Sequence, residues 1–219
     1  YVEENKKQEN ILINDVSNIN LFSNEENNIK EYKYIGTAFE TYIIIEYLGE
    51  LYIIDQHAMH ERVMYEQVKK SYYSGEVLSQ TTLLPEIITL TNREFNVVKE
   101  NMDLFTKSGY VIEDFGENTI KIVGVPYICF DINIKDLFMD ILDEILGSTR
   151  TYKEEREEKF LSTIACKAAV KANMNLDPKE IDKLLTEALK LENPFSCPHG
   201  RPTAIKMSKY EIERKFGRK

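Results

Sequence analysis

The sequence has no long apolar run, few cysteines and no signal peptide. No run approaches the roughly 20 apolar residues of a transmembrane helix, so we expect no membrane partner. The N-terminus is polar, and the three cysteines cannot all pair with one another, so we expect reduced thiols in a cytoplasmic protein. The chain also lacks an initiator Met, and we therefore expect it to be a fragment of a longer protein.

Positive charge is scarce as well. The formal net charge of −9 argues against a large, generic nucleic-acid surface, while 42% hydrophobic and 30% charged residues are ordinary for a soluble globular protein. The C-terminus is the exception, because from Arg201 to Lys219 seven Lys and Arg residues face only Glu211 and Glu213. On charge alone, this basic C-terminal segment fits a binding site for a local anionic partner and a solvated tail equally well.

The first third of the chain divides into a polar segment and a predicted hairpin. Residues 1–31 are rich in Asn, Glu, Lys and Ser and are expected to be a linker that is largely disordered, with order beginning near Tyr34. β-Branched and aromatic residues at Thr41–Tyr47 and Leu51–Ile54 predict two paired strands. The second strand delivers Asp55 at its end, and a helix is expected from about Ala58 to Ser71.

The middle of the chain has the pattern strand, helix, strand, strand, helix, and could form a small α/β unit by itself. Capping-box spacing at Thr91 and Glu94 opens the first helix, and apolar residues at 3.6-residue spacing mark the second. The expected elements are a strand at Thr81–Leu90, a helix with Phe95, Val98, Met102 and Phe105 on one side, strands at Tyr110–Asp114 and Thr119–Val125, and a helix from Ile134 to Gly147.

Two further helices are expected before a polar loop. One begins in the charged stretch near residue 152 and carries small residues around Cys166. The other has Asp177 as N-cap and Pro178 in its first turn, and ends at Asn193-Pro194. The loop Cys197–Pro202 follows.

Candidate metal ligands gather at two places far apart in the chain. Asp55, His57 and Glu61 follow the second predicted strand, and Cys197 and His199 lie in the late loop. His57 and Glu61 share a face if the helix already includes His57, and an extended Cys-x-His directs both side chains to one side. Thiolate, imidazole and carboxylate are ligands that Zn²⁺ selects. Either cluster alone is more often capping and polar packing, but the two together favour a metal site.

Two enzyme classes are disfavoured by the same residues. His60-Glu61 begins like a zincin motif, but Met64 stands where the second histidine is required. Cys197 and His199 lie too close on one extended loop to form a nucleophile and its base. If the two ligand clusters meet, residues 32–76 and 151–219 share one subdomain and residues 77–150 are an insertion.

Three motifs in this order resemble a known family. Asp55-Gln56-His57-Ala58, with Glu61 and Glu66, resembles position for position the endonuclease motif in the C-terminal domain of the MutL family of DNA mismatch repair proteins. Ala165-Cys166-Lys167 is similar to the family's Ala-Cys-Arg/Lys motif, and Cys197-Pro198-His199-Gly200-Arg201-Pro202 to its Cys-Pro-His-Gly-Arg-Pro motif.

The resemblance implies an α+β, two-lobed, homodimerising domain with an inserted regulatory subdomain. It implies nicking of duplex DNA with Mn²⁺ or Mg²⁺ and a structural or regulatory Zn²⁺, in a bacterial cytoplasmic protein that acts at the nucleoid with other mismatch repair proteins. The family's ATPase domain would precede Tyr1. The implied catalytic residues are Asp55, His57 and Glu61, and the implied metal ligands are Asp55, His57, Glu61, Cys166, Cys197 and His199. Gln56, Glu66 and Arg201 are expected to support them, and Glu66, about half a turn out of phase with His57, would orient a ligand or pair with a base. Arg201 and the basic tail could guide the phosphate backbone.

A further segment looks like a docking peptide. Gln80-Thr81-Thr82-Leu83-Leu84-Pro85 is similar to the Gln-x-x-Leu-x-Pro peptide that binds the sliding clamp, with Leu83 filling an apolar pocket and Gln80 bonding at its rim. An ordinary strand start with a proline at its edge explains the segment equally well on sequence alone, and the family context favours the docking peptide. Two functions remain: a metal-dependent endonuclease coupled to the clamp, or a non-catalytic, zinc-stabilised dimerisation and clamp-binding module.

Overall fold

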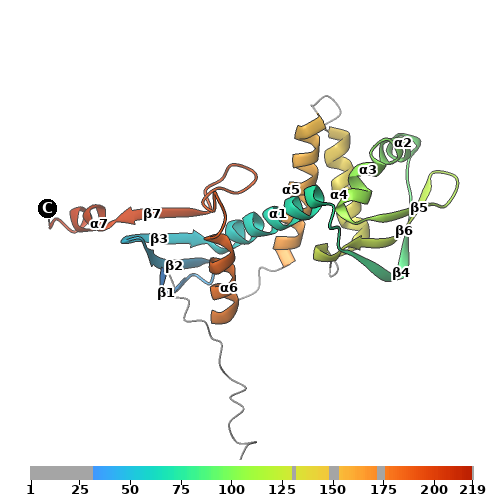
Figure 1. The fold of residues 1–219 in the computed structure, drawn as a ribbon. Coiled ribbons are helices and arrows are strands. Elements are labelled where there is room, and N and C mark those ends of the chain that lie inside the picture. Colours follow the sequence, from blue (N-terminus) through green and yellow to red (C-terminus); the bar gives the residue numbers. More distant parts are fainter. Residues whose placement is uncertain (1–31, 130–131, 148–152, 172–175, 219) are drawn as a thin grey trace, which may run out of the picture. The chain divides into compact units, whose positions relative to one another are not determined.

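The computed structural model describes residues 32–129, 132–147, 153–171 and 176–218, and the predicted linker at 1–31 lies outside them. The strands are β1 (Tyr32–Ala38), β2 (Tyr42–Tyr47), β3 (Glu50–Asp55), β4 (Ser79–Thr89), β5 (Val111–Asp114), β6 (Thr119–Pro126) and β7 (Ala204–Ser208) (Figure 1). The helices are α1 (Gln56–Ser74), α2 (Asn92–Glu100), α3 (Met102–Ser108), α4 (Ile134–Gly147), α5 (Lys153–Lys171), α6 (Pro178–Ala188) and α7 (Lys209–Lys215), with a 3₁₀ turn η1 (Tyr127–Cys129). Helices mixed with two antiparallel sheets confirm the predicted α+β class. None of the described helices combines the length and apolar character needed to cross a membrane.

The first sheet has the strand order β1-β2-β3-β7, and every neighbouring pair is antiparallel. Period-2 alternation buries Ile43 and Ile45 on one face and leaves Ile44 only partly covered on the other. The predicted hairpin of β2 and β3 is confirmed, and its turn uses Leu48 and Gly49, both with positive φ. The sequence did not predict β1 or β7, which pair with the outer sides of this hairpin.

Helix α1 begins directly at the end of β3. The Asp55 side chain caps it by accepting a hydrogen bond of 2.9 Å from Ala58 N, and Gly75 ends it with φ +73. The helix therefore starts two residues before the predicted Ala58 and continues past Ser71. Its first half packs Met59 under the first sheet, and its second half contributes to a different cluster of buried residues.

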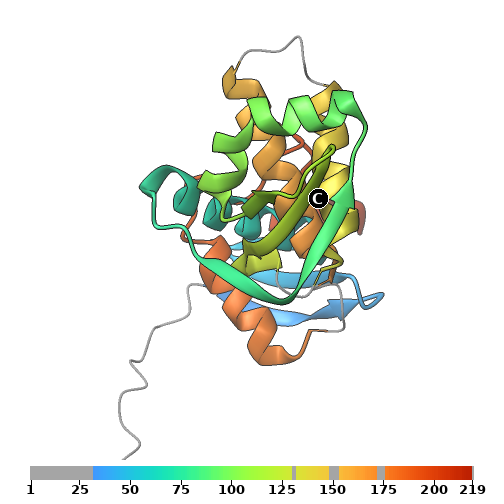
Figure 2. The ribbon, with the colours of Figure 1, turned by 90° about the vertical axis from the view of Figure 1, so that its right-hand side faces the viewer.

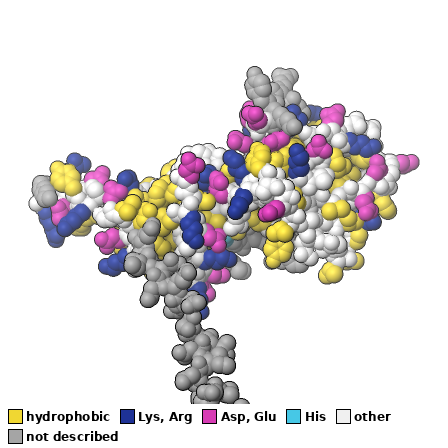
Figure 3. Space-filling model, viewed as in Figure 1, with side chains coloured by type: hydrophobic (Ala, Val, Ile, Leu, Met, Phe, Trp, Pro, Cys, Tyr) yellow, Lys and Arg dark blue, Asp and Glu magenta, His cyan; other side chains and the backbone are white. Residues whose placement is uncertain are grey.

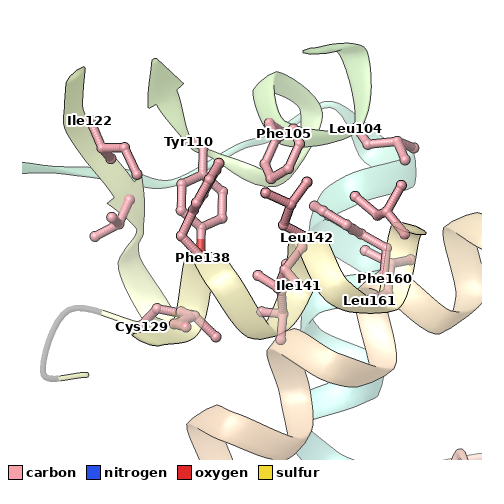
Figure 4. Packing of buried hydrophobic residues seen from close by; sticks show 14 of the residues in the cluster. Leu104, Phe105, Tyr110, Ile122, Cys129, Phe138, Ile141, Leu142, Phe160 and Leu161 are labelled. Atoms are coloured by element: carbon pink, nitrogen blue, oxygen red, sulfur yellow. The ribbon is translucent and has the colours of Figure 1, made fainter. Parts of the chain in front are cut away.

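The second sheet, with the order β4-β6-β5, packs with α2, α3, α4 and α5 (Figure 2). The single helix predicted after Thr91 is wrong beyond Glu100, since Asn101 leaves helical geometry and separates α2 from α3. The cluster is rich in aromatic rings: Phe105 lies 5.2 Å from Phe138 and 5.5 Å from Phe160, centroid to centroid (Figure 4).

Two clusters of buried hydrophobic residues hold the described chain together. The smaller contains residues of the first sheet, the first half of α1 and α6. The larger contains residues of the 77–150 block, the second half of α1 and α5, which contributes Phe160, Leu161 and Ile164. Helices α1 and α5 thus link the predicted insertion to the rest, and the division into subdomains at residues 76 and 150 stays a prediction.

Candidate metal centre

Glu61 is the buried carboxylate around which the candidate centre is built. Because α1 already includes His57, Glu61 lies one turn further along the same helix face. Glu61 as a whole is only 1% exposed. A buried carboxylate is unfavourable unless a hydrogen bond, an ion pair or a metal compensates it, so the partners of Glu61 identify its role.

Cys197 and His199 reach Glu61 from a tight turn. Cys197 N donates to Arg201 O at 2.8 Å, and Gly200 N donates to Cys197 O at 2.9 Å. Gly200 has φ +78, a conformation that an L-residue with a side chain adopts only with strain. The extended Cys-x-His segment expected from the sequence is therefore wrong, because the glycine closes the segment into a turn.

Thr203 fixes this turn to the beginning of α1, a role that the sequence did not reveal. Thr203 is fully buried; its Oγ1 donates to Pro194 O at 2.6 Å, and its carbonyl accepts from Asp55 N at 2.9 Å. The late loop and the Asp55 segment are thus joined through backbone groups. A threonine just after the Cys-Pro-His-Gly-Arg-Pro motif carries no signal in sequence that distinguishes it from a surface residue.

Three possible ligand atoms converge at one point. The carboxylate of Glu61, the Sγ of Cys197 and a ring nitrogen of His199 all lie within 4.8 Å of one another. His199 Nδ1 is 2.6 Å from Glu61 Oε1, yet this oxygen has no hydrogen-bond partner in the described chain, so the contact has the distance of a hydrogen bond without its direction. The buried Nδ1 of His57 also has no hydrogen-bond partner there. Such an arrangement fits a cation held between the donors.

Cys166 lies at the border of this group. Burial raises the pKa of the Cys166 thiol, and the Glu61 carboxylate raises it further, whereas the Arg201 guanidinium acts in the opposite direction. Cys166 is therefore within electrostatic reach of Glu61 and Arg201. Asp55, His57 and Cys166 are not among the three residues whose ligand atoms converge.

The supporting residues take different positions. Gln56 is 4% exposed at the start of α1, and Arg201 is exposed on the turn. Glu66 forms an ion pair of 2.6 Å with Arg62, four residues earlier on the same helix. The ligand, catalytic and supporting roles of all these residues remain predictions.

The candidate clamp peptide lies in β4, away from the metal ligands in sequence. The register between β4 and β6 shifts between Thr81 and Glu86, so the intervening residues bulge from the sheet. Leu83 is 99% exposed and Leu84 is 84% exposed. Two neighbouring leucines with this much exposure are unusual on a sheet and favour an interaction site over an ordinary strand start.

Comparison with known proteins identifies the family. Residues 35–176 match the MutL C-terminal dimerisation domain. The chain is 46% identical over 203 residues to the DNA mismatch repair protein MutL of Clostridium botulinum strain Loch Maree, covering 92% of this chain and 30% of that protein. It is 42% identical over 189 residues to the protein of the same name from Agathobacter rectalis, covering 86% and 29%. The chain spans about a third of the length of the curated relatives that it matches. Since the family match covers most of the described chain, including the helices that carry Glu61 and Cys166, the chain belongs to the MutL C-terminal dimerisation domain family.

Proposed function

We propose that this chain is the metal-dependent endonuclease domain of a mismatch repair protein, which nicks duplex DNA by phosphodiester hydrolysis. The observation that carries the proposal is the convergence of Glu61, Cys197 and His199, whose donor atoms lie within 4.8 Å of one another although they come from opposite ends of the described chain. The relatives are named as DNA mismatch repair proteins, which gives the chemistry a substrate class.

The donor set fits two kinds of ion. Cys197, His199, His57 and Glu61 would hold zinc, because thiolate and imidazole are its preferred ligands. The carboxylates of Asp55 and Glu61 would hold Mn²⁺ or Mg²⁺. One oxygen of Asp55 accepts the cap hydrogen bond from Ala58 N, which leaves the second carboxylate oxygen as a ligand atom. When bound, such ions supply an activated water and neutralise charge on the phosphate.

The residues of the chain itself prepare this site. The cap of α1 orients Asp55 at the end of β3, and the bond from Asp55 N to Thr203 O holds the turn of Cys197 beside it. Burial of Glu61 and Cys197 limits competition from water. Asp55, His57 and Glu61 would then be the residues nearest to the scissile phosphate.

Dimerisation would use the open face of the first sheet. Ile44, Ile53 and Ile205 lie opposite one another across β2, β3 and β7, on the face that the helices do not cover. Ile205 is 57% exposed. A row of isoleucines on an uncovered sheet fits a second copy of a chain that belongs to a dimerisation family, so we propose a homodimer.

Coupling to a sliding clamp would compensate for the acidic character of the domain. The formal charge of −9 opposes strong intrinsic affinity of the domain for DNA. A domain tethered to a clamp on DNA would have a high local concentration near the duplex, so weak intrinsic affinity would suffice. Gln80, Leu83, Leu84 and Pro85 would form the docking peptide, and the exposure of both leucines supports this. The other proteins of mismatch repair are the remaining proposed partners.

A non-catalytic module is the second candidate, and one observation favours it. Asp55 already has a structural use as the N-cap of α1, and the buried Cys197 suits a purely structural zinc site. In that case the domain would only dimerise, bind zinc and dock on the clamp.

A nicking assay on variants of two helix-capping aspartates, Asp55 and Asp177, distinguishes the endonuclease from the non-catalytic module. Asp55→Asn retains a good N-cap but loses a charged ligand, so we expect nicking of supercoiled plasmid with Mn²⁺ to be abolished while folding is retained. Asp177→Asn is the matched control, since Asp177 caps α6 in the same way and is exposed.

Normal nicking by Asp55→Asn would exclude Asp55 as a catalytic ligand. If the wild-type chain does not nick, the pair of variants is compared in the full-length protein with its clamp, and inactivity there favours the non-catalytic module. Zinc content, measured on the same preparations, should fall in Cys197→Ala under either candidate.

A further inference from the structure

We propose that a row of basic side chains, which runs from the candidate metal centre along β7 into α7, binds the phosphate backbone of the duplex. The row consists of Arg201, Lys206, Lys209, Arg214, Lys215 and Arg218, all of them exposed. The inference rests on the proposed function and assigns the DNA-binding surface for the same site.

Charge is the first observation. The chain carries a formal net charge of −9, whereas residues 201–218 contain six cations and only Glu211 and Glu213 as anions. Figure 3 shows Lys and Arg side chains around α7, with hydrophobic and acidic side chains among them. This is a concentrated positive surface on an acidic protein, so an anion would be attracted to this part of the molecule and repelled by most of the rest.

The second observation is that the anions of this segment are already engaged. Glu211 Oε2 accepts hydrogen bonds from Ser208 N at 2.8 Å and from Ser208 Oγ at 2.7 Å, which completes the capping box of α7. Glu213 lies 4.0 Å from Lys209 Nζ. By contrast, no ion pair to Arg214 or Lys215 is found within the described residues.

Among the described residues, Lys206 is the one cation of the row with a closer carboxylate, since its Nζ lies 2.8 Å from Glu50 Oε2. Its ammonium side chain is nevertheless 60% exposed. An exposed pair of this kind contributes little free energy, so a phosphate can replace the carboxylate at small cost.

The geometry connects the row to the metal centre. β7 is an edge strand of the first sheet, and Lys206 lies opposite Tyr52, on the face against which α1 packs. Arg201 begins the row beside the centre, since its carbonyl accepts a hydrogen bond of 2.8 Å from Cys197 N. Five strand residues and seven helical residues extend over roughly 25 Å, about the length of seven base pairs.

Duplex DNA fits this surface better than an acidic protein does. A duplex cut at the metal centre must continue for several base pairs on at least one side, and the row follows one such direction. Tyr210 is 54% exposed and Phe216 is 75% exposed, so aromatic faces for sugar contacts lie among the cations. The competing explanation is that Arg214 and Lys215 only stabilise the C-terminal end of α7 through the helix dipole.

The test compares two variants with the same change in net charge. In the 219-residue chain, Arg214→Gln, Lys215→Gln and Arg218→Gln are combined, and the control combines Lys179→Gln, Lys183→Gln and Lys190→Gln, exposed residues in and just after α6. Binding to a 30-base-pair duplex is measured by fluorescence anisotropy between 50 and 200 mM NaCl, without added Mn²⁺, so that no cleavage is required.

We expect the α7 variant to bind the duplex about tenfold more weakly at 50 mM NaCl. The magnitude of its slope of log K against log salt should fall by up to about 2.7, which is ~0.9 for each lost phosphate contact. In the control variant, affinity and slope should each change by less than half of these amounts. Equal losses in both variants would overturn the inference, since they would reflect net charge alone.

Three further readouts make the result specific. If circular dichroism shows that the α7 variant has lost helix, the inference is overturned, and the basic residues stabilise α7 through the helix dipole. If light scattering shows a changed oligomeric state, it is also overturned, and the surface contacts a second copy of the chain. An α7 variant that binds DNA normally overturns it even if the wild type nicks plasmid. If binding falls as expected and the wild type never nicks, the proposed function fails while the DNA-binding surface stands.

Discussion

The two clusters of buried hydrophobic residues differ in the polar groups that lie beside them. The larger one is built of rings and aliphatic side chains around Phe105 and Phe138, and no converging set of ligand atoms lies within it in the described chain. The smaller one adjoins the region where Gln56, Glu61 and Thr203 are buried, three of the five buried polar residues of the described chain. Apolar packing thus stabilises one region, whereas the other buries polar groups: Thr203 is satisfied by backbone hydrogen bonds, and Glu61 Oε1 has no hydrogen-bond partner in the described chain.

The largest expected effect is in the aromatic region. Phe138 is fully buried and its ring contacts those of Phe105 and Tyr110, so Phe138→Ala should lower the free energy of unfolding by about 3–5 kcal/mol through lost burial and a cavity. Urea unfolding measures it. Phe115→Ala, at a side chain that is 57% exposed, is the control and should change stability by less than about 0.5 kcal/mol. A loss below about 1 kcal/mol for Phe138→Ala would show that this cluster is loosely packed.

Metal removal should affect the other region nearly as strongly. If zinc occupies the centre at about 1,000 times its Kd, chelation should lower the free energy of unfolding by about 4 kcal/mol. Thermal unfolding with and without chelator measures the difference. Cys197→Ala removes one of the three converging donors, so its unfolding should no longer respond to chelator. An identical response of wild type and Cys197→Ala would place the metal elsewhere.

The open face of the first sheet provides a smaller effect. Ile53→Glu places a charge in the row formed with Ile44 and Ile205. The Kd of the dimer should therefore rise at least about tenfold, which corresponds to about 1.4 kcal/mol of association free energy. Sedimentation at several protein concentrations measures this Kd. Ile87→Glu is the control, because Ile87 is 51% exposed in β4, outside the first sheet. Equal dissociation of both variants would locate the interface away from the row.

Local patterns in the sequence determined much of the fold. The hairpin, the N-caps at Thr91 and Asp177 and the amphipathic α4 depend on residues close in sequence, and all are present. β1 and β7 depend instead on pairing with the two outer sides of the hairpin, which no short window reveals. The break at Asn101 is also tertiary, since Arg156 of α5 donates to its side chain at 3.0 Å.

The site was predictable in its residue types but not in its geometry. Glu61, Cys197 and His199 were expected to meet, and they do. The turn that brings Cys197 to Glu61 depends on Gly200 and on the buried Thr203, which bonds to the carbonyl of Pro194 and to the backbone amide of Asp55, far away in sequence. The ligand groups are recognisable in the sequence by their chemistry, whereas the residues that position them have no chemistry that would identify them.

Two tyrosines give the smallest and most direct comparison of the regions. Burial raises the pKa of Tyr110 well above its usual value, and its hydroxyl has no hydrogen-bond partner in the described chain. Tyr110→Phe removes a buried group without removing a bond, so the free energy of unfolding should rise by about 1 kcal/mol. Tyr32, in the smaller cluster, donates a hydrogen bond to Asp182. Tyr32→Phe removes this bond and should lower the free energy of unfolding by about 1 kcal/mol. Urea unfolding of both variants at one pH measures the opposite signs, and a destabilised Tyr110→Phe would mean that a buried water completes the aromatic cluster.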